Sequence, residues 1–513
     1  MELIDTLYII KWWLVLFVIG LIFLPLTIRI FSNFFDKGYI FSKIIGIALI
    51  GYIVFVLGIL KIVPFNTETI LFVIGITITI NIFIFLKITP WQRSNLIKSS
   101  WKLFFFEELL FLLTLFFWSY IRAHAPDIHG LEKYMDFGFV NSILRSKYFP
   151  PTDMWFPPFP INYYYFGHLV TAVLTKLSTI PSYITYNLML STIFAFTFTS
   201  SFSIGANLLY LISKSQITNH KQISNSNFRN SKRFKTLDFG PWKLFGIWKL
   251  GFGNLATGLL TAFLVSFAGN LHTIYAFFKP YENENPVPFW QLAFSPNSFP
   301  NSYWYPNATR FIHNTIHEFP IYSAVVADLH GHYLDVPFVL LIIAVLLSII
   351  SNFKFQISNF KLSIGNWKLE IGIYLIFISF LLAVMYMTNA WDGIIYFILT
   401  IFVLFSLNLT FLSLKDLQPK VQSAKFKVQS YSLKLKVFSF GLLFYASLIA
   451  IGFFLFSLPF SLSFKPFASG IGVLCAPQFL TDIGRIGPFL FEKDHCLRSV
   501  SYTHLTLPTI LRV

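Results

Sequence analysis

Long apolar segments alternate with short polar stretches along almost the whole chain. Because a helix of about 20 apolar residues crosses a hydrocarbon core of ~30 Å, such segments predict transmembrane helices. The segment 336–351 is short and needs its flanking residues to complete a crossing. The pattern predicts an all-α polytopic integral membrane protein with about 10–12 transmembrane helices and structured external loops. The candidate segments are residues 8–31, 40–63, 68–88, 103–121, 164–180, 184–212, 251–278, 336–351, 371–388, 393–413 and 437–461.

The composition supports a membrane protein and gives no reason to expect a nucleic-acid partner. Of the 513 residues, 56% are hydrophobic and only 12% are charged, whereas a soluble domain carries about 25% charged residues. The formal net charge of +16 is concentrated in short loops between apolar segments, as the positive-inside rule predicts. The two cysteines are too few for a disulfide framework and lack metal-binding spacing. We therefore expect a multi-pass protein of the cell membrane, with the lipid bilayer as its partner.

The loop charges predict which loops face the cytoplasm. Loops 89–102, 352–370 and 414–436 are strongly basic and are predicted to be cytoplasmic. Loops 122–163 and 279–335 are predicted to be external. The acid- and histidine-rich motifs would then face one compartment.

The two apolar segments between residues 164 and 212 leave the topology ambiguous. If both cross the membrane, the basic stretch 213–250 lies outside, against the charge rule. If 164–180 only dips into the interface, that stretch lies inside. We favour the single crossing, because the downstream loops agree only with that choice.

The first external loop contains two carboxylates with helical spacing. If residues 131–145 form a helix, Glu132 and Asp136 lie at i and i+4 on one face. Carboxylates so placed could share a divalent metal ion or act as a general base and its orienting group. The alternative is an ordinary solvated helix, although the aromatic and proline residues that follow favour a structured interfacial loop.

A run of tyrosines stands at the mouth of an apolar segment. Asn162, Tyr163, Tyr164, Tyr165 and His168 combine donors, acceptors and aromatic faces that could line a polar substrate site. The alternative is an aromatic belt at the membrane interface, where tyrosine is enriched. A belt accounts for any one tyrosine, but less well for the asparagine and histidine beside the three.

A third polar group lies in the second external loop. Glu318, Asp328, His330 and His332 stand close together in the sequence, and Arg310 precedes them. Histidine and carboxylate groups are common metal ligands, and an arginine suits an anionic phosphate. No second motif of defined spacing identifies a metal, so its identity stays unknown. Helix-end capping and headgroup contact are the alternative roles.

The fourth motif, Thr388-Asn389-Ala390-Trp391-Asp392, lies at a membrane edge. A carboxylate at that depth is costly, so a functional site that includes Trp391 and Asp392 is one interpretation. Capping of a helix that begins at residue 393 is the other, and the sequence favours neither.

Together the four motifs resemble the YYY membrane protein family, a domain of unknown function from archaea and bacteria. That family shows an acidic element, a tyrosine-triplet element, an element with Glu-Phe-Pro and His-x-His, and a Thr-Asn-x-Trp-Asp element. The resemblance implies N-terminal transmembrane helices in residues 1–90 and a family domain in residues 91–490. The corresponding stretches are Glu132–Asp136, Pro160–His168, Glu318–His332 and Thr388–Asp392.

The layout is also similar to that of GT-C-type glycosyltransferases, which use sugars carried on polyprenyl phosphate. This resemblance implies that Asp136 is the general base for an acceptor hydroxyl and that Glu132 orients it or binds a metal. His330, His332 and Arg310 would contact phosphate. The expected function is a glycosyltransferase-like enzyme that uses a polyprenyl-phosphate-linked sugar at the external membrane face.

Two other functions stay open on the sequence alone. A transporter would carry acids near the bilayer midplane, whereas Glu107 and Glu108 are predicted to sit near a cytoplasmic helix end. An uncharacterised, non-catalytic membrane protein is the remaining alternative. Residues 499–513 resemble translated sequencing-adapter read-through. We therefore expect a truncated chain in which residues 491–513 are a non-native tail.

Overall fold

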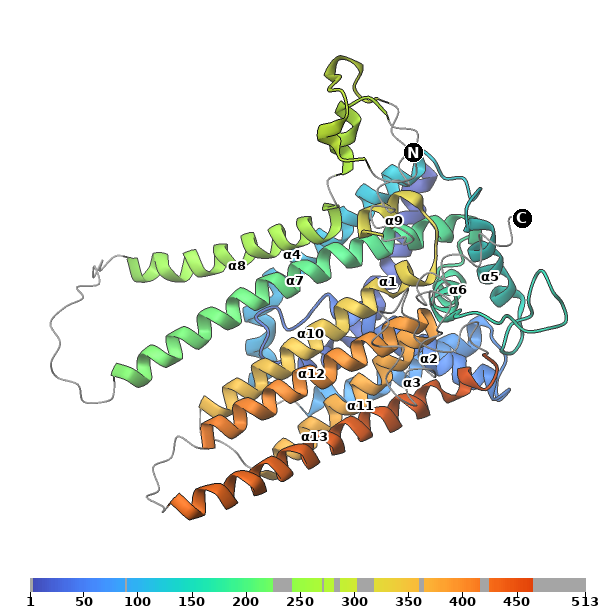
Figure 1. The fold of residues 1–513 in the computed structure, drawn as a ribbon. Helices are drawn as coiled ribbons and strands as arrows, with labels where there is room; N and C mark the ends of the chain where they lie inside the picture. The colour runs from blue at the N-terminus through green and yellow to red at the C-terminus, as the bar shows by residue number, and fades with distance from the viewer. Residues whose placement is uncertain are drawn as a thin grey trace, which may run out of the picture. The chain divides into compact units, whose positions relative to one another are not determined.

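The structure, a computed structural model, is built from helices. The described residues also contain two isolated β-bridges and no sheet (Figure 1). This confirms the prediction of an all-α protein. The structure describes residues 3–87, 90–224, 242–269, 272–280, 287–301, 318–358, 364–415 and 424–464.

The α-helices are joined mostly by short connections, and three short 3-10 turns lie between α8 and α9. The helices are α1 (Leu3–Ile30), α2 (Phe41–Ile59), α3 (Thr67–Leu86), α4 (Pro90–Ala123), α5 (Lys133–Arg145), α6 (Phe166–Ser178), α7 (Ser182–Ser224), α8 (Trp242–Phe267), α9 (Pro320–Val326), α10 (Gly331–Ser358), α11 (Ile364–Thr388), α12 (Ala390–Lys415) and α13 (Ala424–Ser461).

Helix α1 shows how such a sequence folds in a bilayer. Its buried residues Trp12, Leu16, Ile19 and Phe23 recur every three or four positions, which places them on one helix face. The opposite face exposes further leucines and isoleucines. A helix that is apolar on all sides suits protein on one face and lipid on the other.

Eight helices in the described part of the chain are long and apolar enough to cross a membrane. Two shorter apolar helices, Gly253–Phe267 and Gly372–Thr388, accompany them. The prediction of a multi-pass membrane protein is confirmed, and its short segment 336–351 is completed within α10. The eight candidate spans are Leu3–Ile30, Phe41–Ile59, Thr67–Leu86, Ser100–Ala123, Ser182–Lys214, Gly331–Asn352, Ala390–Leu407 and Leu442–Ser461.

Helix α6 explains the ambiguity between residues 164 and 212. It has 13 residues, about 20 Å at 1.5 Å per residue, which is too short to cross a core of ~30 Å. Most of its residues are buried, so its apolar sequence reflects packing inside the protein. Only α7 is long enough to cross in this region, as the single-crossing interpretation expects.

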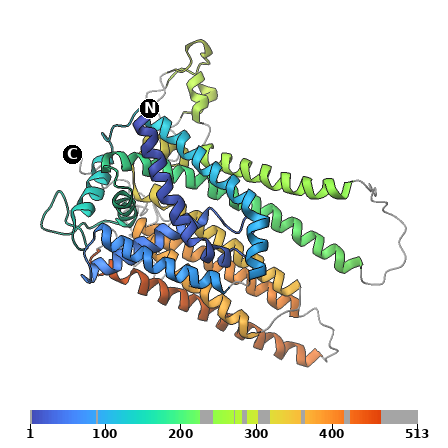
Figure 2. The ribbon, with the colours of Figure 1, turned by 180° about the vertical axis from the view of Figure 1, so that it is seen from behind.

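By its internal contacts the chain divides into two compact units. The first comprises residues 1–266 and 327–464, and the second residues 267–326 and 465–513. Within the first unit α1 packs against α2 and α3, and α4 packs against α7 (Figure 2). Helix α11 packs against α10, α12 and α13. At one end of these helices, α5 and α6 lie beside each other and contact α7.

Candidate functional site

Helix α5 carries the acidic motif and is amphipathic. Lys133, Asp136, Val140 and Ile143 are buried along one face, with the spacing of three or four residues that a helix requires. Glu132 occupies the position just before the first helical residue. The predicted helix over 131–145 is therefore confirmed, although Asp136 points into the protein and Glu132 stays at the helix end.

Asp136 forms a buried pair with the histidine of the tyrosine motif. The distance from its Oδ1 to Nε2 of His168 is 3.1 Å, and both side chains are fully buried. The ring of Phe139 packs edge-on against the imidazole. Burial raises the pKa of Asp136, and the hydrogen bond and charge of His168 oppose that rise. Within the described residues, neither Asp136 Oδ2 nor His168 Nδ1 has a hydrogen-bond partner.

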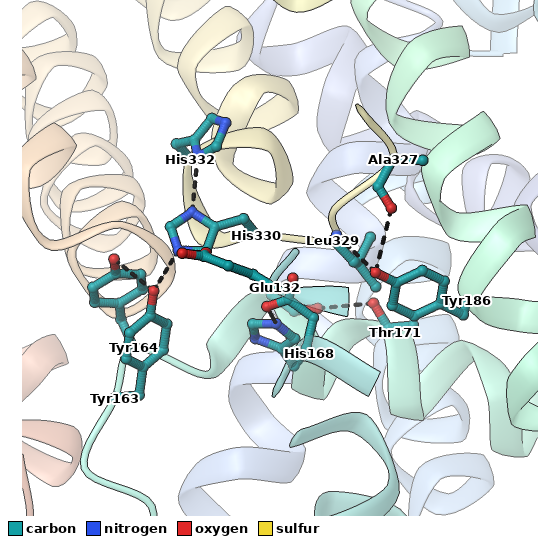
Figure 3. Close-up of polar contacts among 12 residues, drawn as sticks. Glu132, Tyr163, Tyr164, His168, Thr171, Tyr186, Ala327, Leu329, His330 and His332 are labelled. Carbon is teal, nitrogen blue, oxygen red and sulfur yellow. Dashed lines mark hydrogen bonds and ion pairs between the residues drawn. The ribbon is translucent and has the colours of Figure 1, made fainter. Parts of the chain in front are cut away.

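Glu132, Tyr163 and His330 meet at the centre of the site (Figure 3). The Nε2 atom of His330 lies 3.1 Å from Oε2 of Glu132 and 2.5 Å from the hydroxyl of Tyr163. Its Nδ1 atom lies 2.8 Å from Nδ1 of His332. Tyr163 donates to the hydroxyl of Tyr164 at 2.8 Å. Three motifs far apart in the sequence thus join in one hydrogen-bonded network.

One arrangement of protons satisfies these contacts. Because Tyr163 donates to Tyr164, it accepts from His330, whose Nε2–H then points between Tyr163 and Glu132. His330 Nδ1 is consequently an acceptor, and His332 donates to it from its own Nδ1. A neutral imidazole offers one donor and one acceptor in this way. In this assignment Glu132 is an ionised acceptor at the edge of the network.

The segment before α10 is held in place by three contacts. The hydroxyl of Tyr186 accepts from the backbone N–H of Leu329 at 3.1 Å and donates to the carbonyl of Ala327 at 3.4 Å. Lys133 Nζ lies 3.5 Å from Asp328 Oδ1. These contacts connect α7 and α5 to the turn that carries the two histidines, and so fix the histidines relative to the acidic helix.

A close backbone contact at Gly331 leads to a first prediction. A Cβ atom there would lie 2.5 Å from the carbonyl oxygen of Thr388 and 2.5 Å from the ring of Tyr164. Because a backbone oxygen cannot rotate away, we expect Gly331→Ala to destabilise the fold by about 1–3 kcal/mol. Thermal unfolding in detergent would measure this. Gly75→Ala is the matched control, since a Cβ at Gly75 meets nothing within 4 Å, and an unfolding temperature equal in both variants would contradict the prediction.

The fourth motif adds the carboxylate of Asp392, which lies next to a second, buried carboxylate. Asp392 accepts from the side chain of Asn389 at 2.7 Å. Because α12 begins at Ala390, Asp392 lies inside the first helical turn, so the prediction that it caps a helix beginning at residue 393 is wrong. Its other polar neighbour is Asp335 of α10, which is fully buried. Asp335 follows His330 and His332 in the sequence and belongs with them to the group of potential metal ligands.

The tyrosine triplet is divided between the polar site and the protein core. Tyr165 is 1% exposed and its ring packs against Phe55 of α2 and Phe460 of α13. Tyr165 immediately precedes the first residue of α6, and its ring lies among these apolar side chains. Tyr163 and Tyr164 are the tyrosines of the hydrogen-bonded network.

The remaining predicted site residues are Asn162, Trp391, Glu318 and Arg310. Asn162 and Trp391 are half-buried. Glu318 belongs to the second unit, where the hydroxyl of Ser323 donates to it at 2.6 Å. Arg310 lies outside the described residues.

The described part of the site carries more acids than cations. Glu132, Asp136, Asp328, Asp335 and Asp392 are all present, and the lysine of α5 is paired with one of them. Among the described residues, no group of three or more His, Cys, Asp or Glu side chains is arranged to hold a metal ion. The site as described therefore suits hydroxyl donors or a cation better than a free anion.

The pKa of Asp136 leads to a second prediction. A carboxyl group whose pKa is raised by burial stabilises the fold below its unfolded pKa of about 3.9, and this stabilisation is lost as pH rises through its folded pKa. Asn at this position is neutral throughout. We therefore expect the unfolding temperature of Asp136→Asn, relative to the unsubstituted protein, to rise as the pH increases above about 4. A difference that does not change with pH would contradict this prediction.

Comparison with known proteins corrects the family expected from the sequence. The family model that matches, over residues 49–491, is described as uncharacterized membrane protein (DUF2298). This finding replaces the expected membership of the YYY family and the more distant resemblance to GT-C-type glycosyltransferases. No curated protein and no solved structure matches the chain. The match covers most of the chain, which therefore belongs to the DUF2298 family of uncharacterized membrane proteins.

Proposed function

We propose that this membrane protein is a glycosyltransferase-like enzyme that takes a sugar from a polyprenyl-phosphate carrier at the external membrane face. One observation carries the proposal, namely the contact between Glu132 and His330 beside the Tyr163 hydroxyl. The Glu132 side chain is 29% exposed and that of His330 is 13% exposed. A substrate can therefore reach a carboxylate that a histidine already orients.

The reaction requires a base at such a position. The acceptor hydroxyl loses its proton as its oxygen bonds to the anomeric carbon, and the lipid phosphate leaves with the electrons of the broken bond. Glu132 would take that proton, while His330 holds the carboxylate through its Nε2–H. A positioned general base contributes about 10²–10⁴-fold to the rate.

The surroundings of Glu132 suit a sugar. Carboxylates accept hydrogen bonds from hydroxyl groups, and the half-buried aromatic ring of Tyr163 lies beside the histidine that contacts Glu132. The lipid phosphate is an anion, so it would need a cation such as Lys133, whose Nζ lies 3.5 Å from Asp328 Oδ1. The proposal places the sugar at Glu132 and the phosphate near Lys133.

Asp136 has a different role in this proposal. Its carboxylate is fully buried against His168, so it does not reach a substrate in the described arrangement. It lies one helical turn from Glu132 in α5. We assign Asp136 the role of a positioning residue that fixes this turn, and Glu132 the role of the base.

The full-length protein in lipid nanodiscs would test this function. The probe is polyprenyl phosphate carrying a radiolabelled hexose, and the measurement is release of polyprenyl phosphate together with loss of label from the lipid. We expect release by the unsubstituted protein. Absence of release with a panel of labelled hexose donors would reject the transferase.

A transporter is the second candidate, because a specific feature favours it. Lys43 and Glu108 form an ion pair inside the helices of the first unit, and ionisable residues at such depth often mark transport pathways. Proteoliposomes loaded with a pH-sensitive dye would report proton-coupled uptake. Proton uptake into the proteoliposomes, without release of polyprenyl phosphate in the transferase assay, would favour the transporter.

A further inference from the structure

A second group of buried ionisable side chains lies inside the first unit, away from the candidate site. Asp36, in the turn between α1 and α2, and Glu107 of α4 are both 0% exposed. Ser203 of α7, which contacts Asp36, lies roughly 25 Å along the helix from Tyr186. The proposed transferase reaction uses none of these residues.

The Asp36 carboxylate is fully supplied with hydrogen-bond donors. Its Oδ1 accepts from the backbone N–H of Gly38 at 2.9 Å and from Asn207 Nδ2 at 2.9 Å. Its Oδ2 accepts from the hydroxyl of Ser203. These donors come from the turn itself and from α7, and they favour an ionised Asp36.

Glu107 is in the opposite situation. Neither of its carboxylate oxygens accepts a hydrogen bond of standard geometry from a donor in the described part of the chain. Its polar neighbours are the carboxylate of Asp36 and the backbone N–H of Ile40. Two ionised carboxylates are both acceptors, so they cannot bond to each other without a proton between them.

The charged groups near Asp36 and Glu107 do not remove the repulsion between two ionised carboxylates. Lys43 faces Glu107 but already donates to the neighbouring Glu108. Lys37, on the turn, interacts electrostatically with Asp36 and donates to the carbonyl of Ser32. Tyr39 donates to Glu108 at 2.6 Å. A second ionised carboxylate beside Asp36 would be buried without a cation of its own, which is strongly unfavourable.

We propose that Asp36 and Glu107 form a proton-binding site, in which the Glu107 carboxyl group holds the proton and donates it to Asp36. Like-charged carboxyl groups that share a site do not both ionise. The proton sits on Glu107 because the donors around Asp36 stabilise the ionised form of that side chain. A metal ion is the other occupant such a pair could take, but within the described residues no third His, Cys, Asp or Glu completes a metal site.

Infrared spectroscopy of the protein in nanodiscs tests this site directly. A protonated carboxylic acid has a C=O stretching band that a carboxylate lacks. We expect the unsubstituted protein to show a band at pH 8 that disappears in Glu107→Gln, whose amide can still donate to Asp36. Asp127→Asn, which replaces an exposed acid, should leave it intact. An unchanged band in Glu107→Gln, or loss of the band on addition of sodium chloride, would overturn the proposal.

A chemical measurement on the unsubstituted protein keeps the test valid if the variant does not fold. Dicyclohexylcarbodiimide adds to protonated carboxyl groups in apolar surroundings. The acid proton goes to a carbodiimide nitrogen, the carboxyl oxygen bonds to the central carbon, and the acyl group then migrates to nitrogen without any leaving group. Fragment-ion sequencing should find the adduct on Glu107 and not on the adjacent Glu108, which is paired with Lys43. The reverse labelling would overturn the proposal.

Discussion

Replacing Glu132 with Gln is expected to lower the rate of sugar transfer by about 10²–10⁴-fold, the contribution of a positioned general base. The amide keeps the size of the side chain and an oxygen that can accept from His330, but it cannot take a proton. Since the Glu132 side chain is 29% exposed, the unfolding temperature should stay unchanged. Release of labelled polyprenyl phosphate measures the rate, and thermal unfolding measures the fold.

Two matched variants make this result interpretable. Asp127→Asn replaces an exposed acid of the same loop and should retain the full rate. Asp136→Asn removes the charge that faces His168 and should cost about 10–100-fold, as expected for groups that orient a functional side chain. A larger loss in Asp136→Asn than in Glu132→Gln would instead support Asp136 as the base, the role expected from the sequence.

The membrane architecture could be predicted from the sequence, because lipid imposes a simple rule. Any helix that crosses the bilayer must be apolar over about 20 residues, and the apolar segments locate most of the helices. Helix α6 is an exception, because the rule cannot show that this apolar helix does not cross the bilayer. Its 13 residues are apolar because they are buried within the protein, and composition does not distinguish burial in protein from burial in lipid.

The polar pairs of the site were less predictable. The four motifs were recognised, but the contact between Glu132 and His330 joins residues almost 200 positions apart. Sequence spacing predicted the face shared by Glu132 and Asp136, yet it could not show that only Asp136 is buried. The orientation of Tyr165 towards the core depends on where α2 and α13 pack, which no local pattern records.

The burial of the two acids of α4 could not be predicted for a related reason. Glu107 and Glu108 were predicted to lie near a cytoplasmic helix end, and their side chains are 0% and 7% exposed. The position of a residue along a helix can be read from the sequence. The side of the helix that faces its neighbours depends on packing, which here turns both acids towards α1, α2 and the turn between them.

Breaking the buried ion pair between Lys43 and Glu108 is expected to cause the largest loss of folding stability. Glu108 accepts from Trp13 Nε1 at 2.7 Å and from the Tyr39 hydroxyl at 2.6 Å, in addition to Lys43. Lys43 is fully buried, and its Nζ lies 5.2 Å from the ring centroid of Phe111. Each charge is therefore compensated by the other in surroundings where water cannot replace it.

Substituting one partner should leave the other as an uncompensated buried charge. We expect Lys43→Met to destabilise the protein by about 3–5 kcal/mol and to reduce the yield of folded, monodisperse protein in detergent. In the double variant Lys43→Met with Glu108→Gln no charge remains, and the amide oxygen can still accept from Trp13 and Tyr39. The double variant should therefore be more stable than Lys43→Met alone. Thermal unfolding of the three proteins measures the difference, and a double variant less stable than Lys43→Met would show that the uncompensated charge is not what destabilises the single variant.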